Sequence, residues 1–158
     1  MRVAMELRSK EVMPMAIQYC GGSIFTSTAQ TLVVPVNCKG EAFCGLALQF
    51  REQYPNWYGA YRQCCTMGAL RIGRPLLHWG DEPWIVSFPT KDDWRLPSTL
   101  SCIEAGLAAT IRLCARHGVE SIAFPKLGTG AGGLSWQEVR PLMEAYLSTL
   151  ASAVFICM

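Results

Sequence analysis

The chain has 158 residues, of which 51% are hydrophobic and 16% are charged, and its formal net charge is +2. This length suits one domain with a full hydrophobic core, and the apolar fraction excludes an intrinsically disordered chain. The small net charge excludes the strong basic field that alone would predict nonspecific DNA binding. A pocket for a small anionic ligand and no anionic partner at all both agree with it.

The eight cysteines include no C-x-x-C pair, and the two histidines, His78 and His117, form no ligand cluster with them. This spacing indicates reduced thiols and no metal site. Residues 1–10 mix charges with apolar residues, unlike a signal peptide, and no apolar run is long enough to span a membrane. We therefore expect a cytoplasmic protein with no membrane partner, metal or other cofactor.

In the first half of the chain, short apolar runs alternate with helical patterns. We expect strands at 15–19 and 31–36, helices at 45–54 and 57–65, and two strands at 75–79 and 84–88 joined by a turn at 80–83. Pro55 stops the first of these helices.

The second half of the chain contains the clearest helix, which opens at Pro97-Ser98 and ends at Gly118. A strand at 121–125, a glycine loop, a helix through Leu147 and a last strand at 153–157 follow. Pro141 either kinks that last helix or starts its main part.

This alternation predicts one α/β domain over residues 1–158, with three layers (α/β/α) and a mixed, mostly parallel central sheet. Ligands of such sheets bind outside the carboxyl ends of the strands. The sequence therefore places three loops, 37–45, 89–97 and 126–134, around one crevice.

The loop at 126–134 contains four glycines between a strand and the helix start Ser135-Trp136-Gln137-Glu138, which has capping-box spacing. Such a loop lets backbone N–H groups converge on an anion beside a helix N-terminus. The sequence lacks the P-loop motif and breaks G-x-G-x-x-G spacing, so a simple tight turn explains the glycines equally well.

Two polar residues follow strands at their carboxyl ends. Asn37 could hydrogen-bond a ribose hydroxyl or only turn the chain. Lys91 could be an amine nucleophile that forms a Schiff base with a sugar aldehyde, or an ordinary surface lysine, and the carboxylates of Asp92 and Asp93 would favour its charged form. Trp94 and Arg95 could stack on or pair with a ligand, or pack along the loop.

Several of these segments together resemble the macrodomain, the ADP-ribose-binding fold, and in particular the branch that contains DarG-type antitoxins and the terminal ADP-ribose protein glycohydrolase. Each segment is weak singly, but the set occurs in the right order. The matching segments are 31–38 with Gly40, 45–50, 88–91 with 94–95, 125–136 and 138–142.

The resemblance implies an ADP-ribose site and assigns its residues. Lys91 would be the catalytic nucleophile that attacks the anomeric carbon of the distal ribose and forms a covalent lysyl–ADP-ribose intermediate. The glycine loop would wrap the diphosphate and distal ribose. The implied ligand-binding residues are Ser23, Ile24, Asn37, Cys38, Cys44, Gly45, Pro89, Thr90, Leu127, Gly128, Thr129, Gly130, Ala131 and Gly132.

Three positions depart from the family pattern. Ser23 stands where macrodomains usually have an aspartate that contacts adenine. Phe43-Cys44-Gly45 stands where the usual loop has Gly-Lys-Gly, so a bulky Phe43 would reshape the mouth of the site and the lysine is missing. Gly132 stands where the glutamate-directed relative has an aspartate, and the pair Gly132-Gly133 is what DarG-like members show.

The resemblance implies an ADP-ribosyl glycohydrolase acting on thymidine bases in DNA, with ADP-ribosylated DNA as substrate and a cognate ADP-ribosyltransferase toxin as a candidate partner. The alternatives are a glutamate-directed protein de-ADP-ribosylase, turnover of a free ADP-ribose derivative, a non-catalytic ADP-ribose-binding module, and a pocket for another nucleotide if Phe43 blocks ADP-ribose.

Overall fold

The computed structural model describes residues 16–158. The expectations for residues 1–10 and for the start of the strand at 15–19 lie outside the described residues. Over 16–158, the longest and most apolar helix still falls short of what crossing a membrane requires.

The described residues form one sheet with helices packed on it. The strands are β1 (Gln18–Cys20), β2 (Thr31–Asn37), β3 (Leu76–His78), β4 (Trp84–Lys91), β5 (Ser121–Phe124) and β6 (Ala153–Cys157). The helices are the short 3₁₀ turn η1 (Ile24–Thr26), α2 (Gly45–Gln53), α3 (Pro55–Thr66), α4 (Leu100–His117) and α5 (Trp136–Leu147).

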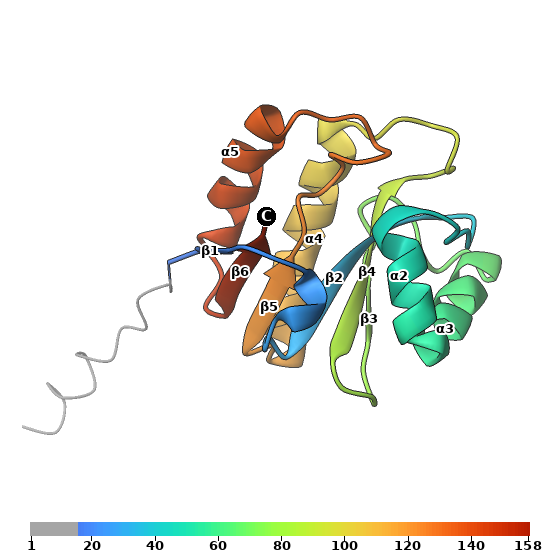
Figure 1. Cartoon of the computed structure of the whole chain (residues 1–158), viewed down its shortest axis with the longest axis horizontal. Coiled ribbons are helices and arrows are strands. Elements are labelled where there is room, and N and C mark those ends of the chain that lie inside the picture. The colour runs from blue at the N-terminus through green and yellow to red at the C-terminus, as the bar shows by residue number, and fades with distance from the viewer. Residues whose placement is uncertain (1–15) are drawn as a thin grey trace, which may run out of the picture.

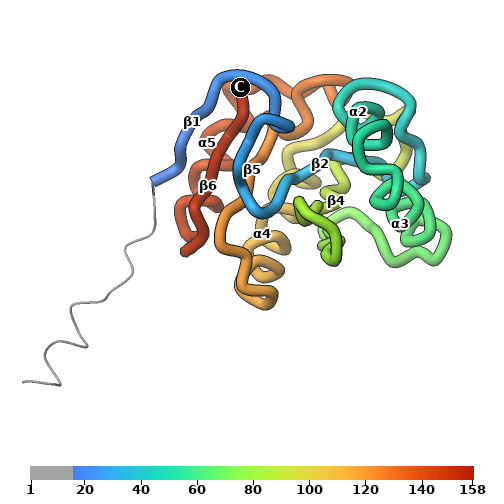
Figure 2. Tube along the Cα trace, turned by 60° about the horizontal axis from the view of Figure 1, so that its bottom comes forward, coloured from blue at the N-terminus to red at the C-terminus, as the bar shows by residue number. Residues whose placement is uncertain are grey.

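The strand order is β1-β6-β5-β2-β4-β3, and β3 alone runs antiparallel, against β4. The sheet is therefore mixed and mostly parallel, as predicted. Its middle strand β2 is almost continuously buried, because helices cover both faces of a parallel sheet. At the edge, the backbone N–H of Met158 donates to the carbonyl of Cys20 at 2.9 Å, which ties the C-terminus to β1 (Figure 2).

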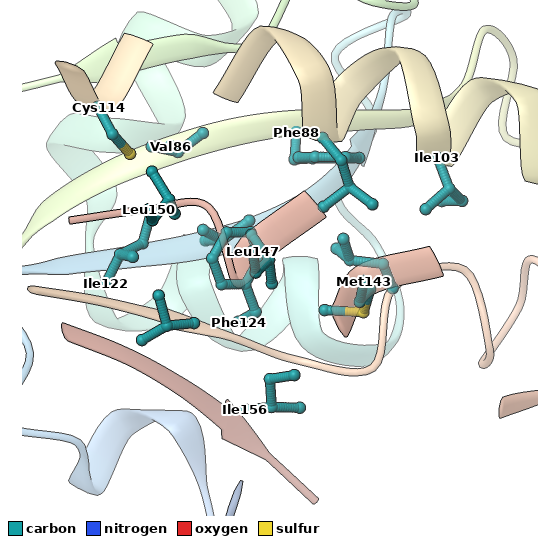
Figure 3. Close-up of a cluster of buried hydrophobic side chains, with 14 of the residues drawn as sticks. Val86, Phe88, Ile103, Cys114, Ile122, Phe124, Met143, Leu147, Leu150 and Ile156 are labelled. Atoms are coloured by element: carbon teal, nitrogen blue, oxygen red, sulfur yellow. The ribbon is translucent and has the colours of Figure 1, made fainter. Parts of the chain in front are cut away.

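Two apolar clusters fill the spaces between the sheet and its helices. One joins β4, β5 and β6 to α4 and α5, and Figure 3 shows Ile103 and Met143 gathered with Phe88 and Phe124. The other packs Phe50 of α2 and Tyr61 of α3 on the opposite face. The helix pairs thus lie on opposite sides of the sheet (Figure 1), which confirms the three layers. Each fully buried Phe or Leu side chain contributes roughly 1.5–3 kcal/mol of hydrophobic free energy.

Several boundaries differ from the sequence prediction. β4 continues through Pro89 and Thr90 to Lys91, so the expected loop at 89–97 starts only after Lys91. α4 begins at Leu100, because the Thr99 hydroxyl caps it by accepting from the N–H of Cys102. α5 begins at Trp136 and includes Pro141, so that proline does not start the helix.

Candidate functional site

A cavity of about 380 Å³ opens at the carboxyl ends of β2, β4, β5 and β6. Parts of all three expected loops, 37–45, 89–97 and 126–134, line it, so the predicted crevice is confirmed. The loops after β4 and β5 lie at the upper edge of the sheet in Figure 1. The lining of the cavity includes Asn37, Glu41, Phe43, Cys44, Gly45, Thr90, Lys91, Trp94, Lys126, Gly128, Thr129, Gly130, Ala131, Gly132 and Cys157.

Most of the residues that the resemblance assigned to ligand binding belong to this lining, but five do not. The Ser23 hydroxyl caps η1 by accepting from the N–H of Phe25 at 3.2 Å, and Ile24 is buried in the core. Cys38 and Pro89 lie next to lining residues in the sequence. Leu127 is fully buried in the cluster that joins β4, β5 and β6 to α4 and α5. Ligand contact by Ser23, Ile24, Cys38, Pro89 and Leu127 stays a prediction.

The glycine loop presents unused backbone donors. Within residues 16–158, none of the N–H groups from Leu127 to Gly132 donates to a protein acceptor. The loop is braced by other bonds: Leu134 N–H to the Gly128 carbonyl at 2.9 Å, and the Thr129 hydroxyl to the Lys126 carbonyl at 2.9 Å. Free backbone N–H groups on a braced loop can donate to phosphate oxygens.

Position 132 requires glycine because the chain there lies against Ser98 and the Gly128 carbonyl. A Cβ there would lie 2.4 Å from Oγ of Ser98 and 2.6 Å from the carbonyl oxygen of Gly128. The backbones also meet, since the Ser98 N–H donates to the Gly132 carbonyl at 3.0 Å. In this conformation the loop has no room for an aspartate at position 132.

The N-terminus of α2 faces the same cavity. Cys44, the N-cap residue, provides no side-chain hydrogen bond, and Gly45, Leu46 and Ala47 line the cavity. The first-turn N–H groups of a helix have no partner within the helix, and the helix dipole makes this end positive. The cavity therefore has a second set of donors for an anion.

Lys91 is the last residue of β4, and a register shift aligns it with Asn37. Val36 pairs with Pro89 and Asn37 with Lys91, so Thr90 is the extra residue of a bulge. Bulges redirect neighbouring side chains, and both Thr90 and Lys91 line the cavity.

The two aspartates after Lys91 pair with other cations. Asp92 lies 3.6 Å from Nζ of Lys39, and Asp93 accepts two hydrogen bonds from the Arg95 guanidinium, at 2.7 and 3.0 Å. The guanidinium and the Arg95 N–H hold the pKa of Asp93 well below its usual range. No carboxylate among residues 16–158 forms an ion pair with Lys91.

The Asn37 side chain holds its own loop. Its Nδ2 donates to the Glu41 carbonyl at 2.8 Å, and its Oδ1 accepts from the N–H groups of Lys39 and Glu41. The turn-forming role is therefore present. A ribose contact through the second N–H of this amide stays a prediction.

Three residues of the lining have no role in the sequence-based assignment. Glu41 and Lys126 lie in two of the predicted loops, and Cys157, the last residue of β6, lies outside all three loops. The rule that selected Lys91 could have selected Lys126 as well. Within residues 16–158, no group of three or more His, Cys, Asp or Glu side chains could hold a metal ion.

Comparison with known proteins gives a consistent picture. A model of the Macro domain family matches residues 33–143. A Mycobacterium tuberculosis protein named DNA ADP-ribosyl glycohydrolase is 39% identical over 127 residues, which are 78% of this chain and 36% of that protein. A Thermosipho africanus protein, named DNA ADP-ribosyl transferase-DNA ADP-ribosyl glycohydrolase fusion protein, is 34% identical over 154 residues (85% of this chain, 40% of that protein). The chain thus spans little more than a third of the length of these curated relatives.

Solved structures agree at the level of the backbone. The macrodomain of Thermus aquaticus DarG superposes with a TM-score of 0.85 at 33% identity, covering 90% of this chain and 97% of that one. The structure titled Thermosipho africanus DarTG in complex with ADP-ribose has a TM-score of 0.84 at 34% identity, covering 89% of this chain and 41% of that one.

Proposed function

The chain belongs to the Macro domain family, and on that basis we propose that it is an ADP-ribosyl glycohydrolase that removes ADP-ribose from thymidine bases in DNA. One observation carries the proposal: Lys91, with no carboxylate partner among residues 16–158, lines the same cavity as the free N–H groups of the glycine loop. The names of the relatives support DNA as the substrate. We treat residues 1–158 as a single macrodomain.

The cavity supplies two kinds of recognition for ADP-ribose. The N–H groups of Leu127–Gly132 and the start of α2 hydrogen-bond the diphosphate. This fixes the ligand so that C1 of the distal ribose lies near Nζ of Lys91. Binding energy from the diphosphate is thereby used to position the reacting carbon.

The reaction proceeds in two displacements at that carbon. The neutral amine of Lys91 attacks C1, the bond from C1 to the base breaks, and the base leaves with the bonding electrons and takes up a proton. The amine loses one proton as the C–N bond to Lys91 forms. Water then adds to C1, the bond to Lys91 breaks, and free ADP-ribose and the unmodified lysine result.

The decisive test compares two lysines of the same cavity. An oligonucleotide with one ADP-ribosylated thymidine is incubated with the wild type, Lys91→Ala and Lys126→Ala, and ADP-ribose release is measured. Loss of a covalent nucleophile lowers kcat by roughly 10³-fold or more, so Lys91→Ala should be almost inactive. Lys126→Ala should retain activity within about 10-fold, because a lost charge contact to a phosphate costs about 1 kcal/mol.

Calorimetry with ADP-ribose separates binding from chemistry. Lys91→Ala should still bind ADP-ribose, since the N–H donors are intact. Equal release by wild type and Lys91→Ala would contradict the nucleophile. Release from an ADP-ribosylated glutamyl peptide alone would assign the enzyme to protein substrates, release only from ADP-ribose 1″-phosphate would assign it to free derivatives, and binding without release from any substrate would leave a binding module.

The fusion of a transferase to a glycohydrolase in the Thermosipho relative supports an ADP-ribosyltransferase toxin as the partner whose modification this chain reverses. A cytoplasmic site of action is supported by the cysteines, all eight of which are free thiols.

A further inference from the structure

Two aromatic side chains meet at the rim of the cavity. Phe43, from the loop before α2, and Trp94, from the loop after β4, pack edge to face with ring centroids 5.3 Å apart and an interplanar angle of 82°. Both line the cavity, yet Phe43 is 48% and Trp94 47% exposed. About half of the surface of each residue is therefore open to contact with a ligand.

The loop that carries Trp94 is held in place. The Asp92 carbonyl accepts from the Cys38 N–H at 2.9 Å, and the Asp93 carbonyl accepts from the Leu96 N–H at 3.0 Å. Asp93 also binds the Arg95 guanidinium, whose carbon lies 5.5 Å from the centre of the Trp94 ring. An aromatic ring fixed before binding loses little entropy when a ligand stacks on it.

We propose that Phe43 and Trp94 form a stacking platform for the nucleobase next to the modified one. This inference rests on the proposed function. An ADP-ribose held with its distal ribose at Lys91 would direct the attached base toward the rim, where the flanking nucleotides of the same strand pass the two rings. Aromatic side chains bind single-stranded DNA through their π faces without strong sequence preference.

The loops that carry the two rings also carry charged residues. Lys39 lies in the loop that carries Phe43, Arg95 follows Trp94 in the sequence, and both are exposed cations. Cations interleaved with aromatic rings are typical of single-strand binding surfaces. Because each of these cations already pairs with an aspartate, phosphate attraction is weak and stacking dominates. The salt dependence of oligonucleotide turnover should therefore be shallow, with a log–log slope of about −1.

The test measures the preference of the enzyme for a strand over a single nucleoside. kcat/KM is determined for ADP-ribosylated thymidine within a single-stranded oligonucleotide and for the ADP-ribosyl-thymidine nucleoside alone. The wild type should prefer the oligonucleotide by about 10-fold, the effect of stacking one base. Phe43→Ala and Trp94→Ala should reduce that ratio toward 1, and Trp94→Phe should retain part of it.

Trp79→Ala is the matched control, because Trp79 is an exposed tryptophan (64%) that does not line this cavity. It should leave the preference unchanged. Release from both substrates with no preference, or a preference that persists in Trp94→Ala, overturns the platform while the proposed function stands. No release from either substrate overturns both. A Trp94→Ala defect seen only with an ADP-ribosylated glutamyl peptide assigns the rim to a protein instead.

Discussion

The two ends of strand β4 carry cavities of opposite character. At the carboxyl end, the 380 Å³ cavity is lined by Lys91 and by the glycine loop, whose N–H groups have no protein acceptor within residues 16–158. At the amino end, a larger cavity of about 640 Å³ lies between α3 and β3 and is lined by Tyr54, Trp57 and His78. There, Trp57 Nε1 donates to Oγ of Ser87 at 3.0 Å, and His78 Nε2 lies 2.9 Å from the same Oγ.

The two cavities differ in how their polar groups are used. Beside the larger cavity, the polar groups Trp57 Nε1 and His78 Nε2 share the hydroxyl of Ser87. The smaller cavity keeps its donors unpaired, which is costly unless a ligand or water accepts from them. We therefore expect changes at the amino end to alter stability, and changes at the carboxyl end to alter binding.

Acid should act on the amino end. Burial lowers the pKa of His78 to about 4, from an unfolded value near 6.5. Between these values the unfolded chain binds more protons than the folded one, so the free energy of unfolding falls as the pH falls through this window. The loss from pH 7 to pH 4 is about 3 kcal/mol for this group. Urea unfolding at both pH values measures it.

His78→Gln isolates that contribution, because other groups titrate equally in both proteins. The variant should lose about 3 kcal/mol less than the wild type over the same range. An identical pH dependence in the two proteins would show that His78 is not the responsible group. ADP-ribose affinity of the folded protein at pH 7 should be the same in both.

The fold was largely predictable because its elements have strong local signals. The apolar spacing of residues 100–114 and the αL glycine at Gly118 (φ 62°) define α4, and the uncharged run at 31–36 defines β2. The end of β4 was not predictable, because Pro89 is unusual inside a strand and the bulge at Thr90 depends on pairing with β2. Tertiary pairing, which no local pattern encodes, decided that boundary.

The site was predictable in position but only partly in chemistry. The rule that ligands bind at carboxyl ends of parallel strands located Asn37, Lys91 and the glycine loop. It could not show that Asp92 pairs with Lys39 or that Asp93 pairs with Arg95, because both pairings depend on how the loop folds back. Nor could it show that Phe43 and Trp94, far apart in the sequence, are in contact.

At the carboxyl end, Gly132→Ala should weaken ADP-ribose binding by about 10-fold, or 1.4 kcal/mol. The added Cβ would overlap Oγ of Ser98 and the Gly128 carbonyl, so the loop must shift and its N–H groups lose their alignment. Calorimetry measures the affinity, and thermal unfolding shows whether the fold persists.

Gly130→Ala is the control in the same loop, since a Cβ at Gly130 meets no protein atom within 4 Å. It should change the affinity by no more than about 3-fold. Equal losses in the two variants would mean that both methyl groups crowd the ligand directly, and unchanged binding by Gly132→Ala would refute the need for a fixed loop.

The smallest effect should come from a residue that links the carboxyl end to the core. The buried Tyr61 hydroxyl donates to the Asn37 carbonyl at 2.6 Å and lies 3.2 Å from Asn37 Oδ1, so it holds the end of β2 against α3. Tyr61→Phe should lower the free energy of unfolding by about 1 kcal/mol and weaken ADP-ribose binding by about 3-fold. Tyr58→Phe, at a partly buried tyrosine of the same helix, should change neither by more than about 0.5 kcal/mol. If Tyr61→Phe loses stability with no loss of affinity, the carboxyl end is rigid without this contact. The contrast between the two ends then depends on the loops alone.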